Sequence, residues 1–66
     1  MTVSEYINLY GIDSLQVVAF IDWQVVVLYD SRKTEADIPS ILADSVIETV
    51  TDNGKYTEIE IYSEAY

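Results

Sequence analysis

The chain has 66 residues, with twelve Asp and Glu against three Lys and Arg, a formal charge of −9, and neither His nor Cys. The absence of His removes the side chain that best shuttles protons near neutral pH, and the absence of Cys removes thiol nucleophiles, disulfides and thiolate metal sites. Three cations are too few to gather nucleic-acid phosphates directly. We therefore expect no catalytic residues, no metal site, no cofactor and no direct nucleic-acid binding. Half of the residues are apolar and the acids are spread along the chain, which predicts one folded domain over residues 1–66.

The N-terminal segment is predicted to form a short helix. Thr2 and Glu5 have the spacing of a capping box, and apolar or aromatic side chains recur at helical spacing up to Tyr10. Gly11 supplies the left-handed residue that ends such a helix. We expect Tyr6 and Tyr10 to lie on its buried face.

The middle of the chain predicts a hairpin and a second short helix. Residues 15–21 and 25–29 are rich in β-branched and aromatic residues, which favours two strands joined by a turn over residues 22–24. Residues 37–44 predict a short helix, with Pro39 tolerated in its first turn.

The C-terminal part predicts a second hairpin, over residues 46–51 and 56–62, with Asn53-Gly54 at the tip of its turn. This register places Val50 opposite Thr57 and Glu48 opposite Ile59, so Glu48 falls on the apolar face unless a bulge moves it outward. The resulting order is α-β-β-α-β-β. The fold class expected is α+β, with a four-stranded antiparallel sheet and two short helices.

The first hairpin has apolar residues at consecutive positions, so both of its faces are apolar. Two short helices cover both faces of a sheet only with difficulty. One interpretation is a homodimer formed through the uncovered residues; the alternative is a central hairpin with one helix on each side. The self-association set is Val18, Phe20, Val26 and Leu28.

A second surface is rich in Tyr and Glu and predicts binding of a basic protein, because flat amphipathic rings and negative charge suit such a partner. Trp23 is either an anchor in this contact or a core-edge residue folded over its own hairpin, the second being the weightier interpretation. The partner-binding set is Trp23, Tyr56, Glu58, Glu60, Tyr62 and Glu64.

Other chemistry finds little support. Aligning Gly54 with the invariant glycine of an EF-hand loop places threonines where carboxylates belong. Carboxylate pairs among Glu48, Glu58 and Glu60 lack a cleft to desolvate one of them, and no base accompanies the Ser and Thr hydroxyls. The longest apolar stretch, residues 17–21, is too short to span a bilayer, so we expect a cytoplasmic protein without membrane contact.

Several segments resemble small acidic accessory proteins of phages and conjugative elements of low-GC Gram-positive bacteria: residues 2–7, 26–30, 37–39 and 46–50. The resemblance implies a protein that binds and inhibits a larger host protein. With the charge, it suggests a nucleic-acid mimic of the anti-restriction or anti-CRISPR kind. Two alternatives stand: the acidity serves solubility alone, or the chain is a homo-oligomeric structural or assembly protein of such an element with no inhibitory role.

Overall fold

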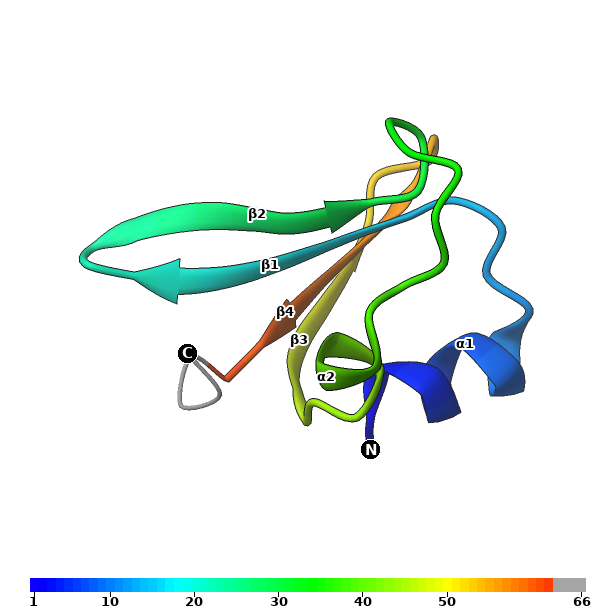
Figure 1. The fold of residues 1–66 in the computed structure, drawn as a ribbon, viewed down its shortest axis with the longest axis horizontal. Coiled ribbons are helices and arrows are strands. Elements are labelled where there is room, and N and C mark those ends of the chain that lie inside the picture. Colours follow the sequence, from blue (N-terminus) through cyan, green and yellow to red (C-terminus); the bar gives the residue numbers. More distant parts are fainter. Residues whose placement is uncertain (63–66) are drawn as a thin grey trace.

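The computed structural model describes residues 1–62 as an α+β domain with extents of 30 × 22 × 20 Å (Figure 1). The elements in chain order are α1 (Val3–Tyr10), β1 (Leu15–Ile21), β2 (Gln24–Asp30), α2 (Ser40–Ala43), β3 (Ile47–Asp52) and β4 (Thr57–Ile61). The predicted order of helices and strands is confirmed. Among residues 1–62, no helix is long and apolar enough to cross a membrane.

The four strands form one mixed sheet in the order β2-β1-β4-β3. Each hairpin is antiparallel, but β1 pairs with β4 in parallel. The prediction of a fully antiparallel sheet is therefore wrong. Joining the hairpins through β1 and β4 places the most buried strands in the centre, where Val17 lies opposite Ile59 and Ala19 opposite Ile61. Burial of these four side chains stabilises the pairing of β1 with β4 at the centre of the sheet.

Both helices lie on the same side of the sheet, here called the inner face (Figure 1). Val3 from α1 and Leu42 from α2 pack against the inward residues of β1 and β4 to form the core. The β1–β2 hairpin extends beyond the helices as an arm (Figure 1). Within residues 1–62, no helix covers the opposite face of the sheet, here called the outer face, or the tip of the arm.

The ends of α1 follow the predicted capping pattern. The Thr2 hydroxyl accepts a hydrogen bond from the Glu5 amide, while the Glu5 carboxylate accepts one from the Thr2 amide at 2.9 Å. Gly11 ends the helix with a left-handed backbone, at φ 62°. Tyr6 packs on the core, but Tyr10 is exposed and its ring lies 4.6 Å from that of Tyr6, so its predicted burial is wrong.

The second hairpin has a longer turn than predicted, and its register differs by two residues. Val50 lies opposite Ile59, with Asn53 donating a backbone hydrogen bond to Tyr56. A bulge at Glu48 turns Ile47 inward, opposite Ile61. The physical reason is that this register buries Ile47 and leaves the Glu48 carboxylate on the outer face, whereas the two-residue turn would desolvate that carboxylate against Ile59.

Candidate protein-docking surface

The outer face of the first hairpin carries exposed apolar side chains. Phe20 and Val25 lie opposite one another, as do Val18 and Val27, so these four share the outer face. Val18 is 1% exposed at the base of this group, whereas Phe20, Val25 and Val27 are about half exposed. With Trp23 at the tip, they form the apolar stripe: Val18, Phe20, Trp23, Val25 and Val27.

Trp23 is the most exposed large side chain of the stripe, at 91%. Its ring meets Phe20 edge to face at a centroid distance of 6.4 Å. The hypothesis of a Trp folded into the edge of the core is therefore wrong. Asp22 and Trp23 form the two-residue turn between β1 and β2, and both have left-handed backbones, with φ 51° and 67°. This backbone matches the twist of a tight hairpin but disfavours a residue with a Cβ, above all a bulky one.

A row of three carboxylates borders the stripe on the same face: Glu48, Glu58 and Glu60, here called the acidic row. Glu60 lies directly beside Val18 across the β1–β4 ladder, and Glu58 lies beside Gln16. Partial burial raises the pKa of the Glu60 carboxyl, and the neighbouring carboxylates of Glu48 and Glu58 raise this pKa further. These acids therefore repel one another while no cation among residues 1–62 forms a salt bridge with them.

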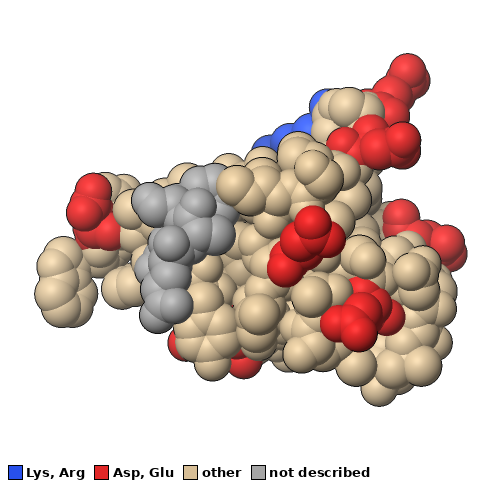
Figure 2. All heavy atoms as spheres, turned by 60° about the horizontal axis from the view of Figure 1, so that its bottom comes forward, with Lys and Arg blue, Asp and Glu red and all other residues tan. Residues whose placement is uncertain are grey.

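On the face that Figure 2 displays, carboxylate side chains are spread over the surface and the blue cations are confined to one edge. Arg32, one of the three cations of the chain, is already engaged within the fold. Its guanidinium makes two hydrogen bonds to the buried Asp30 carboxylate, at 3.0 and 2.8 Å, and lies 3.8 Å from the centre of the Tyr56 ring. The Gln16 amide also donates to Asp30, and these interactions hold the pKa of Asp30 well below its usual range. The free surface charge is therefore almost entirely negative.

The residues of the predicted partner-binding set do not all lie in one place in the structure. In the partner-binding set, Glu58 and Glu60 belong to the acidic row, Trp23 belongs to the apolar stripe, and Tyr62 is half exposed just after β4. The Tyr56 ring is covered on one side by Arg32, and Glu64 lies outside the described residues.

The self-association set does not share one face. Val18 and Phe20 lie on the outer face, whereas Val26 lies opposite Ala19 on the inner face and Leu28 packs on the core. The set omitted Val25 and Val27, which complete the stripe. A two-residue turn at Asp22-Trp23 places Val25 and Val27 on the outer face. The expected three-residue turn over residues 22–24 would have placed Val26 and Leu28 there instead.

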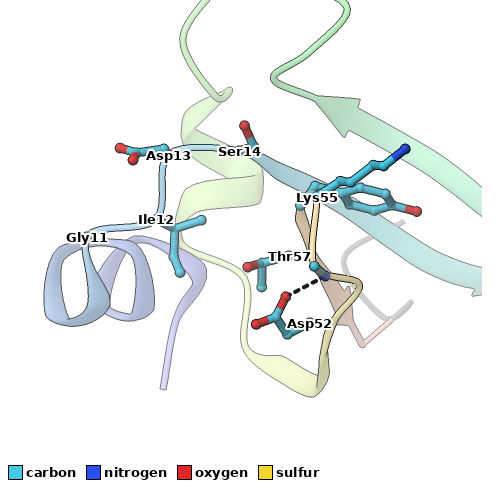
Figure 3. A pocket seen from close by; sticks show the side chains of 9 residues that line it. Gly11, Ile12, Asp13, Ser14, Asp52, Lys55 and Thr57 are labelled. Atoms are coloured by element: carbon cyan, nitrogen blue, oxygen red, sulfur yellow. Dashed lines mark hydrogen bonds between the residues drawn. The ribbon is translucent and has the colours of Figure 1, made fainter.

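A shallow hollow of about 260 Å³ lies elsewhere, between the loop after α1 and the β3–β4 turn (Figure 3). The Asp52 carboxylate on its wall accepts a hydrogen bond from the Gly54 amide at 2.8 Å and so shapes the turn. Asp13 and Lys55 point away from one another at its two sides (Figure 3). Among the described residues no three acidic side chains come together as a metal site. The hollow therefore gathers no set of groups comparable with the stripe and the acidic row.

Comparison with family models, curated proteins and solved structures finds no match for this chain. The chemistry of the outer face is therefore the basis on which a function is inferred.

Proposed function

We propose that this chain is a small binding protein that docks the apolar stripe, with Trp23 at its tip, onto a larger protein and modulates it. The partner would present an apolar pocket for the indole and Lys or Arg side chains beside it. The proposal includes no catalytic step and no cofactor.

The observation that carries the proposal is the exposure of the Trp23 ring together with the left-handed backbone of this residue. A ring that is 91% exposed stabilises the fold very little, and the left-handed backbone at this position favours Gly or Asn. Strained and exposed aromatic residues are found where function requires them, and Trp is the residue most enriched among binding hot spots. The arm holds the indole clear of the core, so a partner can surround it.

The acidic row specifies the charge of the partner. Binding of a cationic surface would relieve the repulsion between Glu48, Glu58 and Glu60, and the charge of −9 would speed the encounter. We further propose that modulation means inhibition of a cytoplasmic host protein, as the resemblance to accessory proteins of mobile elements suggests. Where the cationic surface of that protein normally holds DNA or RNA, the carboxylates would stand in for phosphates, as in an anti-restriction or anti-CRISPR protein.

The test compares what three immobilised proteins retain from a host extract: the wild type, Trp23→Ala and Leu9→Ala. Leu9 is a matched control because it is also an exposed apolar residue, but it lies on α1. We expect a basic protein that the wild type and Leu9→Ala retain, that added salt releases, and that Trp23→Ala binds about thirtyfold more weakly. Equal retention by all three proteins, or retention indifferent to salt, would contradict the proposal.

A further inference from the structure

The two edges of the sheet differ in how they are protected. At the β3 edge, the N-terminal segment pairs with the start of the strand: Ile47 donates to the Met1 carbonyl and Val3 to the Ser45 carbonyl, at 3.0 and 3.1 Å. This edge also carries the charges of Glu48 and Asp52. Covering segments and charged side chains are common ways of preventing a sheet edge from pairing with another chain.

The β2 edge has neither form of protection within residues 1–62. β2 pairs only with β1, and its sequence from Gln24 to Tyr29 contains no charge and no proline. The one acid of the strand, Asp30, is buried and paired with Arg32. An apolar, uncharged edge of this kind is a ready template for a further strand.

The turn determines which backbone groups of β2 face outward. In a two-residue hairpin the pair next to the turn, here Ile21 and Gln24, is hydrogen-bonded, and hydrogen bonding alternates along the strand from there. The N–H and C=O groups of Val25 and Val27 therefore point away from β1. No other residue of the described chain accepts from or donates to them.

We propose that the occupant of this edge is a second copy of the chain, with the two β2 strands antiparallel about a two-fold axis at Val27. In this register Val27 faces its own equivalent and exchanges both backbone hydrogen bonds with it. The hairpin tip with Asp22 then lies beside the segment of the other copy that follows β2. That segment carries Lys33, which forms no salt bridge among residues 1–62, whereas the neighbouring Arg32 is already paired with Asp30 of its own copy. This charge complementarity favours a second copy over an unrelated strand.

The dimer joins the two sheets into one continuous sheet. The two apolar stripes meet at its centre on the outer face, with an acidic row beyond each of them. The stripes stay open to solvent, so the dimer is compatible with docking and offers two anchors to one partner. One strand pair buries less surface than a standard interface of about 1,600 Å² of buried area, and we therefore expect a dissociation constant of roughly 10–100 μM.

Sedimentation equilibrium of the wild type, Val27→Lys and Thr49→Lys tests the proposal. Both substitutions add one cation to the outer face of an edge strand, but only at position 27 do two ammonium groups face each other across the proposed axis. We expect Val27→Lys to weaken the dimer about tenfold or more and Thr49→Lys to leave it unchanged. A wild type that stays monomeric up to roughly 1 mM, or equal effects of the two substitutions, would overturn the proposal.

Amide hydrogen exchange of the wild type provides a measurement that needs no variant. Exchange at Val25 and Val27 should slow as the protein concentration rises, because these amides become paired only in the dimer. Exchange independent of concentration would count against the β2 pairing. Trp23→Ala should dimerise like the wild type, so loss of docking and loss of dimerisation are separable results.

Discussion

Replacing Trp23 by Gly and by Ala should reverse the usual order of stability for these two residues. Within a strand, a protein with Gly is less stable than one with Ala by about 0.5–1 kcal/mol, because Gly has more conformational freedom in the unfolded chain. At Trp23, with φ 67°, any residue with a Cβ additionally pays about 1–2 kcal/mol for the left-handed backbone. The difference between the midpoints of these two ranges favours Trp23→Gly over Trp23→Ala by about 0.75 kcal/mol.

Both variants lose the same edge-to-face contact with Phe20, so that loss cancels in the comparison. The matched control is Gln24, the next residue, which is also exposed but lies in β2 outside the positive-φ positions. There, Gln24→Gly should be less stable than Gln24→Ala by about 0.5–1 kcal/mol.

Urea unfolding measures these differences directly, and thermal unfolding should show a separation of about 4–8 °C per kcal/mol for a domain of this size. If Trp23→Ala is as stable as Trp23→Gly, the turn is not strained, and backbone strain gives no support to a functional role of Trp23. Both Trp23 variants should lose docking to the same extent, because binding requires the indole. A more stable protein that no longer binds is the expected signature of a residue kept for function.

Three further predictions concern charge and capping. Glu60→Gln should stabilise the fold at pH 7, because the raised pKa of Glu60 means that the folded state disfavours its carboxylate. Urea unfolding at a series of pH values should show that this gain in stability vanishes in acid, once Glu60 is protonated. A gain that persists in acid would contradict the prediction. Arg32→Met should destabilise the protein near neutral pH, because the ion pair that lowers the pKa of Asp30 stabilises the fold while that carboxylate is ionised. The loss of stability should shrink as the pH falls below the ordinary pKa of Asp and the Asp30 carboxylate is protonated. A loss of stability that is independent of pH in the same titration would contradict this. Thr2→Ala should cost about 1 kcal/mol in thermal unfolding because α1 loses its capping hydrogen bond, whereas a cost near zero would show that the packing of Val3 fixes the helix alone.

Local signals in the sequence predict the elements well. The capping box at Thr2 and Glu5, the stop at Gly11 and the β-branched runs each depend on a few neighbouring residues, and all appear in the structure. These features are determined within one or two turns of chain. The order of helices and strands was accordingly predictable.

The pairing of the hairpins was not predictable from such signals. Whether β1 meets β4 or another strand depends on burying Val17 and Ala19 against Ile59 and Ile61, which lie about forty residues away in the chain. The β3–β4 register failed for a similar reason. The local preference of Asn53-Gly54 for a two-residue turn is weaker than the gain from burying Ile47 and keeping Glu48 hydrated.

The candidate surface was found only in part, because it depends on that register. The sequence pattern identified part of the surface as exposed or apolar residues of strands and turns, namely Glu58, Glu60, Phe20 and Trp23. The addition of Val25 and Val27 to the same face required the two-residue turn. The contact of Arg32 with the Tyr56 ring joins two segments that lie far apart in the chain and leaves no local pattern.

The arm formed by β1 and β2 departs from what stability and solubility alone would favour. A bulky aromatic occupies a left-handed position where Gly would be more stable, and valines occupy an edge where a charge would prevent pairing. Elsewhere the chain follows both rules, with Gly11 at the left-handed end of α1 and charges at the β3 edge. Because both departures occur in the one element that extends beyond the helices, a shared requirement for binding explains them better than two unrelated defects of folding.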